Sequence, residues 1–385
     1  LLNPLVSQGL VLAVEAPDSE VIDLSETEFS QGVGFTLLLA GAMVVRDLDL
    51  LLAAQAETGA PIVIGSAGGA GANPQVDFVL DALASALEAR SETKTVAVIR
   101  TELDKDTLRA ALREKRIITF ETETELTEAA IDAAEHIVAQ IGPEPIMAAL
   151  EAKPDIVISG RAWDVANVAA LPIKRGFPRG LALHLGKILE CGAQAAHPVE
   201  GSDLLMGRIF SDRFIVESPQ AHKACTLQSI SAHTLYEKTN PVQLPGPGGL
   251  VDLTRTTFEQ IDPVRVAVRG SQFHQAETYT VKLEGARRVG YRHICIGGIR
   301  DPRMVAQIDT IQADLRARLE QNLEPGISRD AYTLTFRRYG LDGVMGPMEP
   351  VRTPAPELGI LIDAVGETPA LAETVSAMAP SPLLH

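Results

Sequence analysis

The chain has 385 residues, which is more than one ordinary hydrophobic core accommodates and indicates two or three domains. It contains 50 acidic and 34 basic residues, and the net charge of −16 argues against a nucleic-acid partner because it repels a polyanion. Apolar residues make up 46% of the chain, but no apolar run approaches the roughly 20 residues of a membrane span. Cys191, Cys225 and Cys295 are too far apart in sequence for a disulfide framework or a zinc motif. We therefore expect a cytoplasmic protein with no membrane partner.

Short apolar runs alternate with helical patterns in the first part of the chain. The runs are continuous, as in strands buried on both faces of a parallel sheet, and they occupy 9–16, 60–65, 94–100 and 153–159. Helical periodicity occupies 73–90, 104–116, 126–142 and 143–153. Asn73, Asp104 and Thr127 stand at the expected N-cap positions of three of these helices. The alternation predicts an N-terminal doubly wound, mostly parallel α/β domain.

The pattern changes twice in the rest of the chain. From about residue 202, alternating runs predict antiparallel strands in a β-rich continuation of the first domain. The C-terminal part then predicts strand, helix, strand, strand and helix at 291–299, 302–321, 332–340, 357–366 and 370–379. This order supplies five of the six elements of a ferredoxin-like α+β domain. We therefore expect domains at 1–285 and 286–385, the second without its last strand.

The stretch LHLGKILECGAQ, at 183–194, combines a helical pattern with several reactive side chains. His184 and Cys191 fall on one flank of the apolar stripe, but at 1.5 Å per residue they lie roughly 10 Å apart along the axis. That separation excludes a hydrogen-bonded nucleophile and base, and a metal site that uses both. We expect a core helix with a buried Cys191 that ends near Gly192; the alternative places His184 or Lys187 in a cleft.

A glycine-rich turn joins a predicted strand to a predicted helix in GSAGGAGANP, at 65–74. Its glycines let the backbone approach a ligand, and the N–H groups at the start of the helix offer an anion site. The spacing is neither GxGxxG nor a Walker motif, so neither a dinucleotide nor a nucleoside triphosphate is indicated. The alternative is a tight turn with no ligand.

The stretch SGRAWD, at 159–164, repeats this arrangement at the end of another predicted strand. Ligands of open α/β sheets bind beyond the carboxyl ends of the strands, where Arg161 stands. A guanidinium there is suited to a bidentate carboxylate, either that of a ligand or that of Asp164, a plausible N-cap residue. The sequence leaves both alternatives open.

Cys225 immediately precedes Thr226, which we predict to be the N-cap of a helix. A helix N-terminus lowers the pKa of a thiol, so this cysteine is the best candidate for a reactive thiol. A buried and inert cysteine is the alternative, and a hydrolase that uses Cys225 requires a base within hydrogen-bond reach.

Several blocks, in the same order along the chain, resemble the acyclic terpene utilisation (AtuA-like) family, formerly a domain of unknown function. They are GSAGGAGANP, ISGRAWDVA, KILECGAQAAH, ACTLQSISAHTLYEKTNPVQL, YTVKLEGARRVGYR, GGIRDPR and RRYGLDGVMGPMEP. The resemblance runs from about residue 34 to the end and implies an α/β domain followed by a ferredoxin-like domain. It also implies a part in the bacterial catabolism of branched terpenoid acids such as citronellate, which proceeds on acyl-CoA thioesters through carboxylation and hydration.

The resemblance and the motifs together define the candidate site. We expect catalytic roles for Asp164, Glu190, Cys191, Lys282 and Glu284, and ligand binding by Ser66, Gly68, Gly69, Asn73 and Arg161. A carboxylate would move a proton next to a carbonyl group, while the basic groups and backbone amides stabilise the enolate-like charge. We expect no metal and no certain cofactor, although the substrate could be a CoA thioester.

The leading hypothesis is a cytoplasmic catabolic enzyme, of the hydratase, lyase or isomerase class, that acts on a small branched carboxylate or its CoA thioester. One alternative is a non-catalytic assembly subunit, which predicts exposed apolar surface on the ferredoxin-like domain and a cleft whose polar residues pair with one another. Another is the Cys225 hydrolase. Homo-oligomerisation is expected on general grounds.

Overall fold

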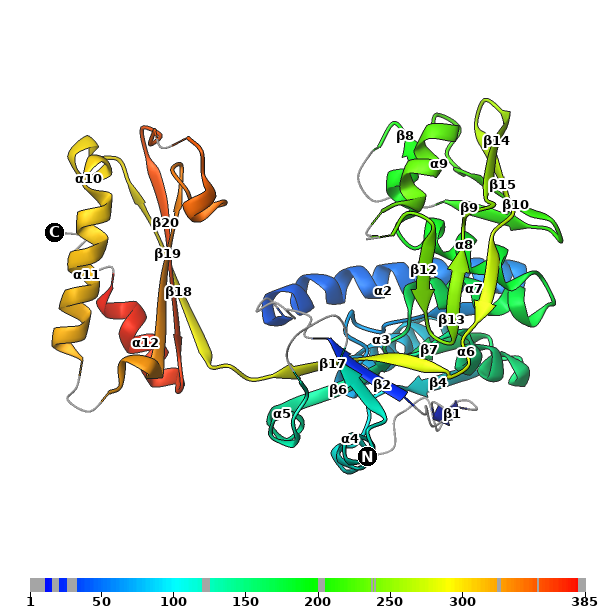
Figure 1. The fold of residues 1–385 in the computed structure, drawn as a ribbon, viewed down its shortest axis with the longest axis horizontal. Helices are drawn as coiled ribbons and strands as arrows, with labels where there is room; N and C mark the ends of the chain where they lie inside the picture. Colours follow the sequence, from blue (N-terminus) through cyan, green and yellow to red (C-terminus); the bar gives the residue numbers. More distant parts are fainter. Residues whose placement is uncertain are drawn as a thin grey trace. The chain divides into compact units, whose positions relative to one another are not determined.

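The computed structural model describes residues 11–15, 21–25, 33–119, 125–199, 205–236, 238, 240–323, 327–351 and 353–379. The chain forms two compact units, Leu1–Arg287 and Arg288–His385, each of which is described by itself (Figure 1). Helices and strands occur in both units, so the predicted mixed α/β class is confirmed.

A four-stranded parallel sheet forms the centre of the first unit. Its order is β1 (Val11–Glu15), β4 (Val96–Arg100), β7 (Ile156–Ser159) and β3 (Ile62–Ile64). Successive side chains of a strand point to opposite faces, so a continuous apolar run supplies two cores. Val98 and Ile158 pack with α2 (Val33–Thr58) and α3 (Asn73–Arg90). Ile99 and Val157 pack with α6 (Pro143–Ala149) and α7 (Asp164–Lys174), so helices cover both faces.

A second, mixed sheet adjoins the first. Its order is β5 (Ile117–Thr119), β2 (Val21–Ser25), β17 (Thr280–Arg287) and β6 (Ala134–Gln140). The strand β17 runs parallel to β2 and antiparallel to β6. Two isolated bridges, Glu102 with Val138 and Ile141 with Ala162, connect β6 to the carboxyl ends of β4 and β7. As a result, residues late in the unit lie beside the edge where the parallel strands end.

The prediction of one helix over 126–142 is wrong. The helix α5 covers only Glu128–Ala133, and the chain then continues as β6. The β-branched residues Ile137 and Val138 suit a strand, and antiparallel pairing of β6 with β17 satisfies its backbone groups. Tertiary pairing therefore overrides the helical spacing of the apolar residues.

Helix starts are partly as predicted. Asp104 caps α4 (Lys105–Arg113) by accepting a hydrogen bond from the Thr107 N–H, and Thr127 caps α5 in the same manner, so both N-caps are confirmed. Asn73 and Asp164 are wrong as N-caps, because each is the first helical residue and the caps are Ala72 and Trp163.

Three antiparallel sheets make up the rest of the first unit. The largest contains β14 (Thr257–Asp262), β15 (Arg265–Arg269), β10 (Arg213–Glu217) and β9 (Met206–Ile209). The others pair β12 (Gln243–Gly246), β13 (Gly249–Asp252) and β16 (Gln272–Gln275), and β11 (Ala224–Cys225) with β8 (Ala196–His197). The apolar side of the largest sheet, including Phe214 and Val268, packs against α8 (Arg179–Leu189) and α9 (Leu227–Thr234).

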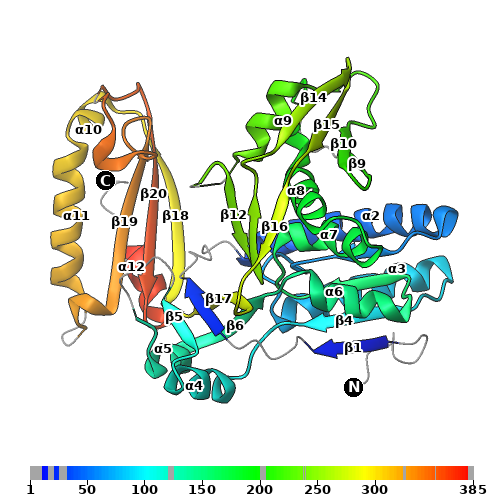
Figure 2. The same cartoon turned by 45° about the vertical axis from the view of Figure 1, so that its right-hand side comes forward.

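The second unit follows the predicted order of strand, helix, strand, strand and helix, except that two consecutive α-helices replace the one helix predicted over 302–321. Its described elements are β18 (Tyr291–Ile299), α10 (Pro302–Ala306), α11 (Ile308–Asn322), β19 (Tyr332–Tyr339), β20 (Leu358–Gly366) and α12 (Pro369–Met378). The sheet is antiparallel in the order β18, β20, β19. The helices cover one face of it (Figure 2), where Ile360 and Ile362 are buried against Leu319 and Val375.

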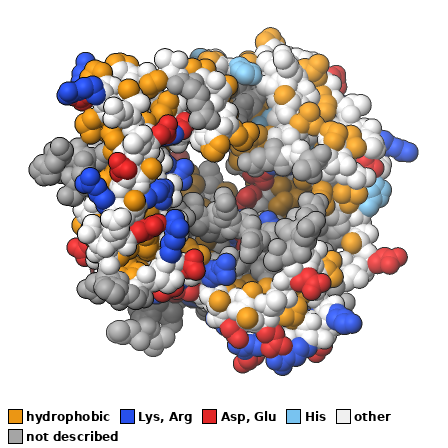
Figure 3. All heavy atoms as spheres, turned by 60° about the vertical axis from the view of Figure 1, so that its left-hand side comes forward, with side chains coloured by type: hydrophobic (Ala, Val, Ile, Leu, Met, Phe, Trp, Pro, Cys, Tyr) orange, Lys and Arg blue, Asp and Glu red, His pale blue; other side chains and the backbone are white. Residues whose placement is uncertain are grey.

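Two surface properties bear on the partners of the chain. Within the described ranges, no helix combines the length and the apolar character needed to cross a membrane. On the face shown in Figure 3, acidic and basic side chains are interspersed with apolar ones rather than gathered into an area of one sign.

Candidate functional site

The carboxyl ends of β3, β4 and β7 lie side by side and are followed by polar loops. The Ser66 N–H donates to the Gly160 carbonyl at 3.0 Å, and the Ala67 N–H donates to the Ser159 carbonyl at 3.0 Å. Gly71 is required here, because a methyl group added to it would lie 2.1 Å from the backbone nitrogen of Arg161. The glycine-rich turn therefore packs directly on the loop that carries Arg161.

Arg161 is the centre of a buried ionic cluster. Its Nε donates to Glu284 Oε2 at 2.7 Å and its Nη2 to Glu284 Oε1 at 3.2 Å, a bidentate geometry. Its Nη1 donates to Ser66 Oγ at 2.8 Å and reaches Asp164 Oδ1 only at 3.4 Å. The side chains of Arg161 and Glu284 are 15% and 2% exposed. The main partner of Arg161 is therefore a residue more than a hundred positions away, rather than Asp164.

The charges in the cluster stabilise one another. Burial opposes ionisation of Glu284, but the hydrogen bonds and positive charge of Arg161 outweigh burial and hold the pKa of Glu284 below its ordinary value. Lys282 Nζ lies 3.4 Å from Glu284 Oε1 and acts in the same direction. The cluster brings together five residues of the predicted site: Ser66, Arg161, Asp164, Lys282 and Glu284.

Ser66 adopts an unusual backbone conformation in this cluster. Its φ of 46° lies in the left-handed region, which a residue with a side chain rarely occupies. The conformation lets Ser66 Oγ accept a hydrogen bond from Arg161 and donate to the Ala162 carbonyl at 3.2 Å. Gly68 and Gly69 also have positive φ, at 65° and 95°, so they shape the turn in which Ser66 lies.

A histidine and carboxylate pair, which the sequence analysis missed, lies near the cluster. His136 Nδ1 is 2.7 Å from Glu102 Oε1, and Glu102 Oε2 accepts the Asn73 N–H at 2.7 Å. The expected anion position at the start of α3 is thus taken by Glu102. Because Glu284 pairs with Val138 on β6, two positions from His136, strand alternation puts Glu284 and His136 on the same sheet face.

Buried polar atoms without hydrogen-bond partners surround the same strand ends. In the described part of the chain they include Gln75 Oε1, Thr101 Oγ1, Ser159 Oγ and Asn167 Oδ1. A methyl group added at Gly160 would lie 2.4 Å from Thr101 Oγ1, and one added at Gly65 would lie 2.0 Å from Asn167 Nδ2. Buried polar groups in native proteins are nearly always hydrogen-bonded, so this set indicates unused hydrogen-bonding capacity beside Arg161.

The predicted helix at 183–194 is largely a core element, as expected. The helix α8 ends at Leu189 instead of near Gly192. Cys191 precedes a short 3₁₀ turn and is only partly buried, so the prediction of a buried Cys191 is wrong. His184 is fully buried; its ring nitrogens lie 2.7 Å from Ser271 Oγ and 3.1 Å from Thr234 Oγ1. Burial lowers the pKa of His184 to about 3, so the ring is neutral and does not face a cleft.

Glu190 forms an ion pair with Lys187 of its own helix, and their side chains are 10% and 7% exposed. A methyl group added at Gly186 would lie 2.6 Å from the Val165 carbonyl oxygen, so this end of α8 packs on the first turn of α7. Glu190 and Cys191 thus lie just beyond the C-terminal end of α8, and no hydrogen bond described around Arg161 involves them.

Cys225 does not have the properties of a nucleophile. It is fully buried on β11, and burial, together with the charge of Glu217, raises the pKa of its thiol to about 11. Thr226 caps α9 as predicted, but its hydroxyl and the Ser229 hydroxyl complete a capping box at that helix start. Cys225 is therefore an inert core thiol.

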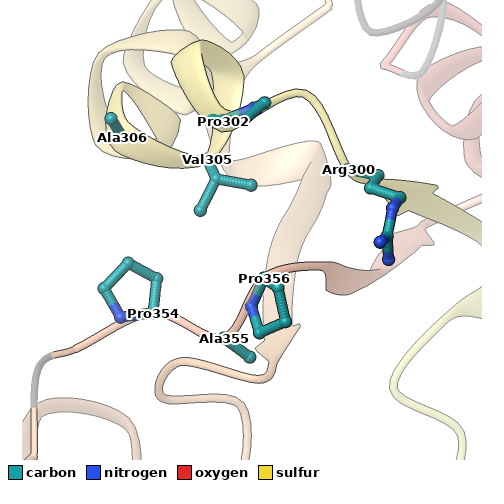
Figure 4. A pocket seen from close by; sticks show the side chains of 7 residues that line it. All are labelled: Arg300, Pro302, Val305, Ala306, Pro354, Ala355 and Pro356. Carbon is teal, nitrogen blue, oxygen red and sulfur yellow. The ribbon is translucent and has the colours of Figure 1, made fainter.

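The second unit contains an apolar hollow of about 470 Å³ beside α10 (Figure 4). Its lining is mostly small and apolar: Pro302, Val305, Ala306, Pro354, Ala355 and Pro356. Arg300 lies at its rim and pairs with Glu357 at 2.9 Å. Among the residues that the structure describes, no group of three or more His, Cys, Asp or Glu side chains is placed to hold a metal ion.

Comparison with known proteins gives one match. The chain matches the family described as "Acyclic terpene utilisation family protein AtuA" over residues 42–200 and 212–381. No curated protein and no solved structure matches the chain.

Proposed function

Because the chain belongs to the acyclic terpene utilisation family, which implies a part in acyclic terpene catabolism, we propose that it is an enzyme of that catabolism. The reaction is of the hydratase, lyase or isomerase class, on a small branched carboxylate or its CoA thioester. One observation carries the proposal: the unpartnered buried oxygens of Thr101, Ser159 and Asn167 lie beside a buried arginine at the carboxyl edge of a parallel sheet.

Arg161 and Lys282 bind the negative charge of the substrate. The hydrogen bonds of Arg161 to Glu284, Ser66 and Ala162 use four of its N–H groups, which leaves a second Nη2 hydrogen for a ligand oxygen among the described contacts. Lys282, with a side chain 27% exposed, adds a second positive charge. Charge that develops on an enolate-like oxygen is stabilised by such fixed cations in a site shielded from water.

His136 moves the proton. Its Nδ1 is bound to Glu102, which fixes the tautomer and orients the ring, and its Nε2 is the atom that accepts a proton from the carbon next to the carbonyl group. The side chain of His136 is 37% exposed and that of Glu102 is 17% exposed, so the base is reachable while its partner is held. Glu284 stays ionised as the partner of Arg161, and Asp164 supports Ser66 at 3.3 Å.

The test is proton exchange in deuterium oxide. The full chain is incubated with branched short-chain carboxylates and their CoA thioesters, and mass spectrometry measures deuterium gained next to the carbonyl group. We expect exchange with the wild type, a loss of at least about 100-fold in His136→Gln, and retained binding in calorimetry. His293→Gln is the matched control, because His293 is an exposed histidine of the other unit. Absence of both binding and exchange in the wild type would overturn the proposal.

A non-catalytic assembly subunit is the second candidate, and specific observations favour it. The second unit exposes large apolar side chains: Ile296 at 76%, Val344 at 83% and Met348 at 78%. The charged groups around Arg161 also pair with one another, as this alternative predicts. An assembly subunit would bind none of the carboxylates or thioesters, and its solution mass would decrease when Ile296 and Met348 are replaced by serine.

A further inference from the structure

A second group of ionisable side chains lies at the end of α8, apart from the hydrogen bonds of Arg161. Lys187 and Glu190 form their ion pair there, and Lys187 Nζ lies 5.6 Å from the centroid of the Tyr236 ring. Tyr236 stacks on His233 at a centroid distance of 5.5 Å and an interplanar angle of 12°. The turn after α9 therefore covers the buried ion pair with aromatic surface.

Lys238 belongs to the same group, because the charges of Lys187 and Glu190 act on it. Its Nζ is buried and has no hydrogen-bond partner in the described part of the chain. Burial and the positive charge of Lys187 lower its pKa from 10.5 to about 8, and the charge of Glu190 offsets part of that decrease. Among the described residues, the carboxylate of Glu190 therefore acts on both amines.

The physical consequence is an amine that loses its proton easily. A buried cation is stable only if it is paired, and Lys187 already occupies Glu190. Lys238 thus exists in part as the neutral amine, which is the nucleophilic form of lysine. Desolvation beside another cationic group is a recognised way to activate a lysine toward carbonyl compounds.

We propose that Lys238 Nζ is a nucleophile that forms an imine with the carbonyl group of a small aldehyde or ketone. The neutral amine adds to the carbonyl carbon, the carbonyl oxygen becomes a hydroxyl group, and this leaves as water when the C=N bond forms. Glu190 carries the proton from the nitrogen to the departing oxygen, and Lys187 stabilises the negative charge on that oxygen. This site goes beyond the proton transfer proposed at His136 and does not depend on it.

The charged and titratable groups that interact electrostatically with Lys238 come from α8 and its C-terminal end. The charges of Lys187 and Glu190 act on Lys238, and the charge of Lys238 acts on His184. His184 stays neutral above pH of about 3, so it does not titrate in the range of the test. The residue Lys238 is half-buried as a whole while its Nζ is covered, so the proposal is restricted to small aldehydes and ketones.

The test labels the intact chain with acetaldehyde or acetone in the presence of cyanoborohydride, between pH 6 and 9, and measures the rate at each lysine by peptide mass spectrometry. Lys115 and Lys153 are exposed and serve as references within the same sample. At pH 7, about one amine in ten is neutral at Lys238, against about one in three thousand at an ordinary lysine. We expect labelling of Lys238 to be at least tenfold faster than that of the references, with a midpoint near pH 8.

Variants separate this proposal from a fold defect and from the proposed function. Lys187→Met removes the neighbouring positive charge, so the midpoint for Lys238 moves to higher pH. Glu190→Gln removes the proton carrier and also a charge that raises the pKa of Lys238, so the midpoint moves to lower pH while the rate at pH 9, where the amine is neutral in both proteins, decreases. His136→Gln, which stops proton exchange at the other site, leaves the labelling of Lys238 unchanged. Labelling of Lys238 in the wild type no faster than that of Lys115 would overturn the proposal.

Discussion

Two buried polar networks of the first unit differ in the charge they carry. The network around Arg161 and Glu284 is ionic, and unpartnered oxygens lie beside it. The network around His184 is neutral: each ring nitrogen meets a hydroxyl oxygen, and the ring makes edge contacts with Phe214 and Phe258 at centroid distances of 5.3 and 6.1 Å. Both networks are buried, but hydroxyl groups take both ring nitrogens of His184, whereas unpartnered oxygens remain beside Arg161 in the described part of the chain.

This difference shows how to separate a functional polar cluster from a structural one. A buried ion pair stabilises a fold poorly, because the cost of removing two charges from water offsets most of their attraction. A neutral network that satisfies every partner makes a core specific without that cost. The small contribution of such a pair to stability therefore supports the ligand site that we propose at the sheet edge.

The largest expected effect comes from breaking the ionic network on one side. Arg161→Met leaves Glu284 as a buried carboxylate without its bidentate partner, and we expect a loss of about 3–5 kcal/mol in the free energy of unfolding. Arg161→Met combined with Glu284→Leu removes both charges and should cost much less. Urea unfolding of the two single variants and the double variant measures the difference. If the double variant lost as much unfolding free energy as the two single variants added together, the pair would not be coupled.

The neutral network predicts a smaller loss that depends on pH. His184→Leu removes two hydrogen bonds but keeps most of the packing, so we expect a loss of about 2–3 kcal/mol at pH 7.5. The folded pKa of His184, about 3, lies below its ordinary value of 6.5, so the unfolded state binds more protons between these values. The wild type therefore loses stability as pH falls from 6.5 toward 3, whereas the variant lacks this dependence.

The measurement compares the urea midpoints of the wild type and His184→Leu at pH 7.5 and pH 4.5. Two pH units below 6.5 correspond to about 2.7 kcal/mol for one group, so the stability advantage of the wild type should nearly disappear at pH 4.5. An advantage of the same size at both pH values would mean that His184 is protonated in the folded state.

The sequence predicted the parallel sheet because its signals are local. The strands at 62–64, 96–100 and 156–159 are continuous apolar runs, and each lies within a run predicted as a buried strand. Thr127 and Asp104 were recognisable as caps because a cap interacts only with the next few residues. The position of Arg161 at the end of a strand follows from the same local pattern.

The partners of Arg161 were not predictable in the same way. Glu284 reaches it only because β17 pairs with β6, and the sequence pattern of β6 is also consistent with a helix. Its apolar residues occur both at helical spacing and in a short β-branched run, so only the pairing with a distant strand decides between the two. The same error concealed His136, which a strand assignment would have put on the face that carries Glu284.

The smallest expected effect concerns the strain at Ser66 in the ionic network. Ser66→Gly relieves the left-handed backbone but loses the hydroxyl that Arg161 contacts, so the two effects of about 1 kcal/mol each should nearly cancel. Ser66→Ala keeps the strain and loses the hydroxyl, so urea unfolding should show it about 1 kcal/mol less stable than Ser66→Gly.

Ser91 is the matched control for that strain, because its φ of 52° is also left-handed and it lies at the end of α3 rather than in the cluster. Ser91→Gly should therefore stabilise the chain by about 0.4–1 kcal/mol, because it relieves the backbone strain without removing a hydroxyl that contacts Arg161. If Ser66→Gly stabilised the chain equally, the hydroxyl would contribute nothing to the stability of the ionic network, and the strain at Ser66 would have to be explained by the ligand site that we propose.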